Sequence, residues 1–196
     1  MDFYALSERL ASIARTRPAV GTLDDAAEGE RRAAVAMLLR QREDSPELLL
    51  LRRVERDGDR WSGQIGLPGG HADPEDADLL ATARREALEE VGLDLAHDAR
   101  ILGQLPPVQA KARGVLLPLW ISPFVFAAER PVEPHPGPEA VETFWFPLER
   151  ARTGELAWTH RYRRDHEERV LPAWKFEERV VWGLTYEIVS GLLRLT

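Results

Sequence analysis

The chain has 196 residues, of which 44% are hydrophobic and 30% charged, as expected for one globular domain with a sizeable core. A formal net charge of −7 argues against a general nucleic-acid binder. The absence of cysteine excludes disulfides, thiolate catalysis and cysteine-ligated metals. The N-terminus lacks a basic-then-apolar signal pattern, and no run of about 18 apolar residues occurs. We therefore expect a cytoplasmic protein without a membrane span.

Three elements are predicted before the centre of the chain. An amphipathic pattern over residues 3–16 predicts a helix, which we interpret as a docking arm without chemistry within residues 1–20. The apolar runs 33–39 and 47–53 flank a turn-rich segment, so they predict a β-hairpin.

A longer helix is predicted over residues 79–91. The segment contains no Gly or Pro and is rich in Ala, Leu, Arg and Glu, which all favour helix. Asp76 or Asp78 suits the N-cap, and Gly92 suits the left-handed position that ends a helix. The face predicted to be apolar consists of Leu80, Ala81, Ala87, Leu88 and Val91.

Three carboxylates fall roughly opposite that face. Glu86, Glu89 and Glu90 are spaced i, i+3 and i+4, so they are neighbours on the helix surface. Such a cluster is either a solvated charged face or a site for a hard divalent cation, which takes oxygen ligands and phosphates. Arg85 would then hold one carboxylate in place. The double glycine within residues 67–70 favours the metal site, because it lets the backbone approach a ligand closely.

Residues 85–93 resemble the second half of the Nudix box, Gly-x5-Glu-x7-Arg-Glu-U-x-Glu-Glu-x-Gly-U, in which U is bulky and apolar. Every required position in that half matches. The first half departs, because counting back from the arginine places Ala77 at the Glu position and His71 at the Gly position. If Gly70 is the motif glycine, Asp76 takes the acidic position and the loop is one residue longer. We predict that Asp76 starts the helix and does not bind metal.

The resemblance implies a single α/β domain over residues 1–196, an α/β/α sandwich with a mixed sheet, in which the box spans 69–93. It also implies hydrolysis of a diphosphate linkage with Mg²⁺ or Mn²⁺. One of the box glutamates, or a loop glutamate, would be the base. The catalytic positions fall on Arg85, Glu86, Glu89 and Glu90, and the metal positions on the same three glutamates and Gly70.

An upstream signature narrows the family resemblance. The matching residues are Leu49, Leu50, Arg53, Gly63, Gln64, Pro68, Gly69 and Gly70, and they resemble the signature of the coenzyme A pyrophosphatase branch. That branch typically has Thr, Ser, His and Phe where this chain has Leu51, Val54, Trp61 and Leu67. The run of Asp73, Asp76 and Asp78 also resembles the longer box of this branch.

The branch resemblance implies that coenzyme A is cleaved to 3′,5′-ADP and 4′-phosphopantetheine. Two alternatives remain. One is a Nudix hydrolase of ADP-ribose, NADH or a nucleoside triphosphate, and the other is a non-catalytic Nudix-fold binding module. The expected partner is a small nucleotide, without nucleic acid or membrane, and the oligomeric state stays open. The residues predicted to bind substrate are Arg53, Arg60, Gly69, Gly70, Lys111 and Arg113, although charge clusters of this kind are more often solvated.

Strands and loops alternate after the box. Strands are predicted over 100–105 and 139–146, and residues 115–126 are predicted to form one kinked strand or two short ones. Residues 108–114 are predicted to form a loop, either exposed or facing phosphate. Residues 131–138, which contain four prolines, are predicted to form a rigid loop.

The last third contains a predicted short helix at 147–150, a hairpin within 158–173 and a terminal helix over 179–195. In Nudix folds a glutamate near the 139–146 strand often assists catalysis. Glu139 and Glu142 are the two candidates, and each is otherwise a solvated surface residue.

Overall fold

The computed structural model describes residues 2–16, 29–43, 45–56, 61–112, 115–164 and 167–196. Its main sheet contains β1 (Arg31–Arg42), β2 (Ser45–Arg53), β3 (Ile65–Gly66), β4 (Gly69–His71), β5 (Ala99–Gln104), β6 (Val108–Ala112), β7 (Val115–Ala128) and β8 (Ala140–Pro147). The strand order is β3-β2-β1-β7-β5, with β4 paired to β1, β6 to β7 and β8 to β2. The β1–β7 pair is parallel, whereas β1 pairs antiparallel with β2 and β4, so the sheet is mixed. The predicted hairpin of β1 and β2 is present.

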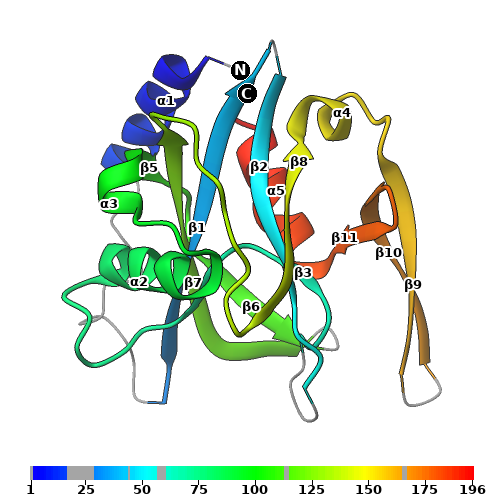
Figure 1. The fold of residues 1–196 in the computed structure, drawn as a ribbon. Helices are drawn as coiled ribbons and strands as arrows, with labels where there is room; N and C mark the ends of the chain where they lie inside the picture. Colours follow the sequence, from blue (N-terminus) through cyan, green and yellow to red (C-terminus); the bar gives the residue numbers. More distant parts are fainter. Residues whose placement is uncertain (1, 17–28, 44, 57–60, 113–114, 165–166) are drawn as a thin grey trace.

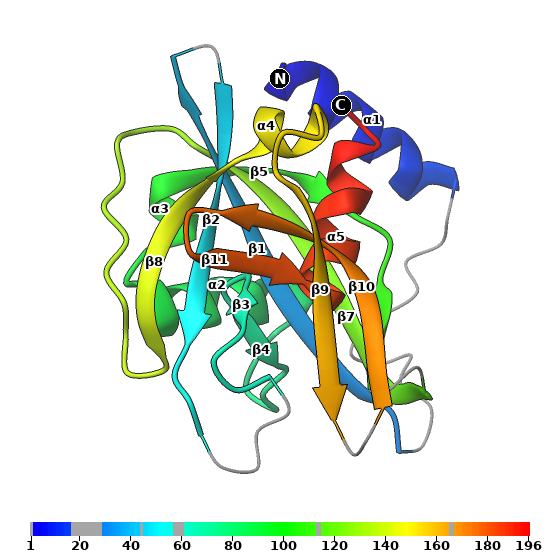
Figure 2. The ribbon, with the colours of Figure 1, turned by 90° about the vertical axis from the view of Figure 1, so that its right-hand side faces the viewer.

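Helices cover both faces of this sheet (Figures 1 and 2). The helices are α1 (Phe3–Thr16), α2 (Leu79–Val91), α3 (Leu95–Asp98), α4 (Leu148–Arg152) and α5 (Gly183–Leu193). One buried cluster joins α2 and α3 to the sheet, and a second joins α1 and α5 to the other face. The two clusters are separate because successive side chains of each strand point to opposite faces. The α/β/α sandwich predicted from the sequence is confirmed.

A second sheet of three strands stands beside the first. It contains β9 (Ala157–Arg164), β10 (Glu167–Phe176) and β11 (Arg179–Trp182), in the order β11-β10-β9. The predicted hairpin is β9 and β10. The predicted terminal helix over 179–195 is wrong at its start, because Arg179 to Trp182 pair with β10 and the helix begins at Gly183. The β-branched Val180 and Val181 favour the strand, and Gly183 has a positive φ where the strand ends.

A further prediction needs correction. The segment predicted as a loop over 108–114 forms strand β6 as far as Ala112, because its backbone pairs with β7 and its Ala110 side chain is buried. Of the two alternatives for residues 115–126, one kinked strand or two short ones, the structure has a single strand, β7. Pro123 lies inside that strand, and its carbonyl accepts a hydrogen bond from the Leu105 amide.

The N-terminal helix has the predicted bounds within the described residues. Leu6 and Leu10 are buried, and the Ser7 hydroxyl donates to the Leu102 carbonyl on β5 at 3.0 Å. Residues 17–20 of the predicted docking arm lie outside the part of the chain that the structure describes, and its role stays a prediction. Among the described helices, none is both long and apolar enough to cross a bilayer.

Candidate active site

Helix α2 is rotated relative to the face predicted from the sequence. Leu88, expected in the core, is 54% exposed, whereas Glu90 is only 2% exposed. The small side chains of Ala83 and Ala87 are buried in the cluster that contains Ala34 and other β1 residues. This orientation turns Glu90 inward to the glycine strand β4, where missing side chains leave room for a carboxylate. The three glutamates therefore do not form one solvated face.

Glu90 is the most deeply buried of the three carboxylates. Its Oε2 accepts a hydrogen bond from the Gly69 amide at 2.8 Å, and its Oε1 lies 3.5 Å from an Nη of Arg53. Burial raises the pKa of Glu90 to about 7, against the opposing effects of the Gly69 amide and Arg53. A carboxylate with this pKa holds or releases a proton near neutral pH.

Glu86 lies against the backbone of Gly70. A Cβ atom added to Gly70 would lie 2.5 Å from Glu86 Oε1, so any side chain at that position would displace the carboxylate. Burial also raises the pKa of Glu86, while hydrogen bonding to Arg85 opposes that shift. The strand backbone and two carboxylates thus meet at one point.

Arg85 links the preceding loop to the carboxylates. Its Nη1 donates to Glu86 at 2.9 Å and to Glu89 at 3.2 Å, and its Nη2 donates to the His71 carbonyl at 3.1 Å. Asp76 accepts from the same guanidinium, and that hydrogen bonding raises the pKa of Arg85 above its usual value. Arg85 therefore orients several acidic groups at once.

Asp76 does not start the helix, contrary to the prediction. The N-cap is Asp78, which has an extended backbone and whose side-chain Oδ1 accepts a hydrogen bond from the Ala81 amide at 2.7 Å. The Asp76 carboxylate instead points along the helix to Thr82 and Arg85, and the Arg85 hydrogen bonds hold its pKa at about 2. The cap therefore lies two residues after Asp76, and the Asp76 carboxylate faces the side of the helix.

A proline-rich loop closes over the C-terminal end of α2. The Gly137 amide donates to the Glu90 carbonyl at 2.8 Å, and the His135 amide donates to the Val91 carbonyl at 3.0 Å. These bonds satisfy carbonyls that a helix end leaves without partners. Two residues later, the charge of Glu139 raises the pKa of both Glu86 and Glu90. The loop thus brings a fourth carboxylate near the site, from one of the two glutamates that the sequence offered as candidates.

The structure separates the two loop glutamate candidates. Glu139 forms an ion pair with Arg56 at 3.0 Å. It lies at the edge of the carboxylate cluster, which consists of Glu86, Glu89 and Glu90. Glu142 instead accepts from Arg52 at 2.8 Å and from Arg179 at 2.8 Å, and the Arg179 hydrogen bond lowers its pKa. Glu142 therefore belongs to an ion-pair network that ties β2 and β8 to β11.

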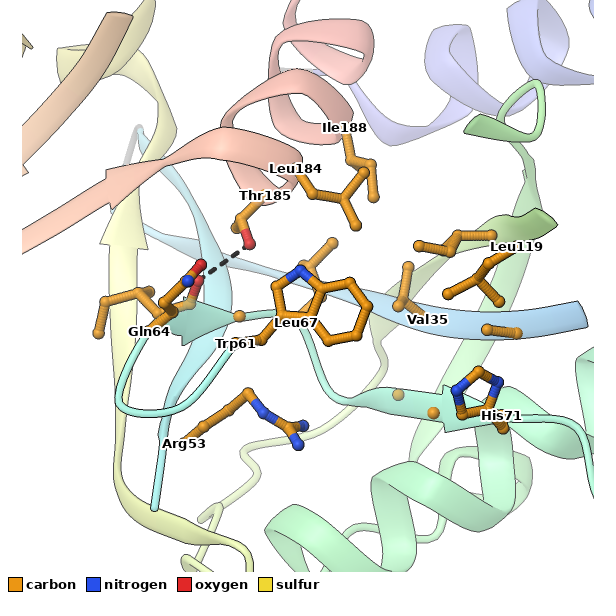
Figure 3. A pocket seen from close by; sticks show the side chains of 16 residues that line it. Val35, Arg53, Trp61, Gln64, Leu67, His71, Leu119, Leu184, Thr185 and Ile188 are labelled. Atoms are coloured by element: carbon orange, nitrogen blue, oxygen red, sulfur yellow. Dashed lines mark hydrogen bonds between the residues drawn. The ribbon is translucent and has the colours of Figure 1, made fainter. Parts of the chain in front are cut away.

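A cavity of about 290 Å³ opens beside the carboxylates. Arg53, Gly69, Gly70 and His71 line it (Figure 3). The pKa of His71 is lowered by burial and by the charge of Arg31. Residues from α5 line the opposite wall, and the sequence predicted a terminal helix there without assigning it to the site. Because Arg53, Gly69 and Gly70 contact both the cavity and the carboxylates, the two form one continuous site.

Of the remaining predicted substrate residues, the structure describes only Lys111, and it is not gathered there. Lys111 Nζ lies 3.4 Å from Glu187 on α5, and Lys111 does not line the cavity. Arg60 and Arg113 lie outside the described residues. Their assignment to substrate binding stays a prediction.

The acidic side chains are close together without forming a ready set of ligands. Within the residues that the structure describes, no three carboxylate or imidazole groups converge in a metal-binding arrangement. Arg85 engages Glu86 and Glu89, while Gly69 engages Glu90. The donors are nevertheless all carboxylate oxygens, of which those of Glu90 are buried and those of Glu89 exposed. Negatively charged oxygen ligands are the chemistry that hard divalent cations select.

The fold and this carboxylate helix match known proteins. Residues 30–167 match the NUDIX domain. The mitochondrial coenzyme A diphosphatase NUDT8 of Homo sapiens is 34% identical over 83% of this chain and 68% of its own length. The Yersinia enterocolitica protein named Uncharacterized Nudix hydrolase NudL is 35% identical over 75% of this chain and 72% of its own. A crystal structure of a C. elegans Ap4A hydrolase complex covers 63% of this chain and 84% of that one, with a TM-score of 0.52 and 22% identity.

The chain therefore belongs to the Nudix hydrolase family. It is a pyrophosphohydrolase of a fold that binds small nucleotide derivatives, and enzymes of this family generally use divalent cations.

Proposed function

We propose that this protein hydrolyses the diphosphate linkage of coenzyme A or its derivatives to 3′,5′-ADP and 4′-phosphopantetheine. One observation carries the proposal: four residues of the upstream signature line the cavity that meets the carboxylates. These residues are Arg53, Gln64, Gly69 and Gly70. The name of the human relative, a coenzyme A diphosphatase, supports the same substrate.

The carboxylate cluster fits a divalent metal. Glu86, Glu89, Glu90 and the Gly70 carbonyl would hold Mg²⁺ or Mn²⁺, because all are oxygen donors and Gly70 has no side chain to occupy the space. Burial of Glu86 and Glu90 raises the pKa of each, so the site favours added positive charge. A bound metal would neutralise diphosphate charge and lower the pKa of a bound water.

Side chains of the protein would bind the phosphates, remove a proton from the attacking water and orient the glutamates. Arg53 faces the junction of cavity and carboxylates, where its guanidinium is suited to bidentate phosphate binding. Two carboxylates are candidates for the base that removes the water proton. Glu90 has a pKa near neutrality, and Glu139 stands at the edge of the cluster. Arg85 keeps the glutamates oriented.

The proposal is tested with a substrate panel. Coenzyme A, dephospho-coenzyme A, NADH, ADP-ribose and a nucleoside triphosphate are incubated with Mg²⁺ or Mn²⁺, and products are identified by mass. We expect the highest kcat/KM for coenzyme A. Loss of the 3′-phosphate should reduce kcat/KM by about tenfold or more, because cationic donors lose their partner.

A different ranking would redirect the assignment. Preference for NADH or ADP-ribose would overturn the coenzyme A proposal and favour another diphosphate substrate. If the whole panel stays intact while a nucleotide still binds, the Nudix-fold binding module becomes the better description.

A further inference from the structure

The cavity beside the carboxylates has a wall that the diphosphate chemistry does not require. Leu184 and Ile188 point into it from α5, and Leu119 lies on the wall formed by the sheet (Figure 3). The aliphatic lining residues are Ala33, Val35, Ile65, Leu67, Leu119, Ile121, Leu184 and Ile188. Pockets of this kind, mainly apolar with a few polar groups, are typical of small-molecule sites.

One side of this cavity touches the reacting centre. Gly69 lines the cavity, and its amide donates to Glu90. Arg53 also lines the cavity, and its guanidinium lies 3.5 Å from the same carboxylate. A substrate with its diphosphate at the carboxylates therefore has one half directed along the glycine strand and beneath α5.

We propose that this cavity, bounded by α5, β1, β4 and β7, binds a flexible, largely aliphatic arm attached to the diphosphate. The inference rests on the proposed function and deepens it. Under it, the substrates are diphosphates with one nucleoside half and one chain-like half of the pantetheine kind. The nucleoside lies outside the cavity, on the other side of the diphosphate.

The lining favours a chain over a nucleobase. A base presents several hydrogen-bonding edge atoms, and burying them without partners is unfavourable. Two polar lining residues are already engaged, since the Thr185 hydroxyl donates to the Ile65 carbonyl at 2.9 Å and Arg53 faces Glu90 (Figure 3). Gln64 and His71 are further polar residues of the lining, and the small number of polar groups suits the few amides of a pantetheine-like arm. The aliphatic wall suits its methyl and methylene groups.

Trp61 is the lining residue that best suits a nucleobase, because an indole can stack on a planar ring. Its ring lies across the cavity in Figure 3, between Arg53 and Leu184. Most of the other lining residues are aliphatic, however, and branched side chains pack against methylene groups as well as against rings. We therefore assign Trp61 as one wall of the arm pocket.

The test fills the cavity and measures the two product halves separately. Leu184→Trp enlarges a partly buried cavity residue, and Leu193→Trp makes the same change on α5 outside the cavity. Binding of 4′-phosphopantetheine and of 3′,5′-ADP to the metal-free protein is measured by calorimetry. Leu184→Trp should weaken 4′-phosphopantetheine binding by about tenfold or more and leave 3′,5′-ADP within about twofold. Leu193→Trp should change neither.

The opposite pattern, in which Leu184→Trp weakens 3′,5′-ADP, would show that the cavity holds the nucleoside and overturn the inference. An equal loss of binding of both product halves in Leu184→Trp would also overturn the inference. If Leu184→Trp does not fold, Ala33→Val narrows the cavity from the opposite wall and should give the same selective loss. Failure of the proposed function is recognised separately, because the wild-type protein would then leave coenzyme A intact.

Discussion

The carboxylate of Asp76 accepts hydrogen bonds from both Nε and Nη2 of Arg85, each at 3.0 Å. This bidentate pair is 6% exposed on the Asp76 side, and the Thr82 hydroxyl adds a third hydrogen bond at 2.8 Å. Because the same guanidinium also donates to Glu86, the pair connects the loop before α2 to the carboxylate cluster. Asp76 is thus a positioning residue for Arg85.

Asp76→Asn should destabilise the protein, contrary to what a simple helix cap would allow. Arg85 hydrogen bonding lowers the pKa of Asp76 from 3.8 to about 2, which corresponds to about 2 kcal/mol of unfolding free energy at neutral pH. A lowered folded-state pKa stabilises above the unfolded pKa, and this contribution is lost as pH falls toward 2. The difference from wild type should therefore shrink below about pH 4. Urea unfolding across this range measures it.

Asp78→Asn is the matched control for that variant. Asparagine caps a helix about as well as aspartate, so stability should stay nearly constant. Equal losses for the two variants would mean that Asp76 contributes no more than a cap.

Glu86→Gln and Glu90→Gln should each lower kcat by about 100-fold or more, because an amide neither binds a hard cation well nor accepts a proton. Thermal unfolding in chelator should show no loss of stability for Glu90→Gln, since the change removes a buried charge. Glu75→Gln, at an exposed loop position, is the control. Turnover near the wild-type rate in both variants would refute the assignment of the helix to catalysis.

Glu139→Gln and Glu142→Gln should have opposite signatures. Glu139 stands at the carboxylate cluster, so its loss should lower kcat with little change in stability. Glu142 pairs with Arg52 and Arg179, so its loss should reduce the free energy of unfolding by about 1 kcal/mol and leave kcat unchanged. Steady-state kinetics and urea titrations of both variants decide this. A kcat loss confined to Glu142→Gln would reverse the assignment.

Gly137→Ala should disturb the end of α2. An added Cβ would collide with the Glu89 carbonyl oxygen, and the loop that donates to Glu90 would have to move. We expect a loss of about 1–3 kcal/mol in unfolding free energy together with a lower kcat. Gly191→Ala is the control, since a Cβ there meets only Arg194 at 3.6 Å. If stability falls but kcat does not, the loop has no part in positioning the carboxylates.

The local sequence pattern was sufficient to predict those elements whose structure depends on residues close together in the chain. Helix propensity and the caps located the helix over 79–91 with its observed bounds, and two apolar runs around a turn-rich segment located the hairpin of β1 and β2. Family membership followed from residues 85–93, because metal chemistry requires particular side chains at fixed helical spacing.

Spacing could not determine which helix face turned inward. Glu90 is buried and Leu88 is exposed because the Glu90 carboxylate accepts from the Gly69 amide of β4, and β4 is paired to a distant strand. Strands β6 and β11 were likewise missed, since their hydrogen-bond partners lie on other strands.

The sequence by itself determined the chemistry, namely a helix of carboxylates after a double glycine, because that motif is contiguous. Only the tertiary structure decided which groups surround it. Asp76 reaches Arg85, Glu139 and not Glu142 joins the cluster, and α5 closes a cavity from the far end of the chain. Asp76 reaches Arg85 through the loop that precedes α2, whereas Glu139 and α5 come from distant parts of the chain, and no local propensity encodes these contacts.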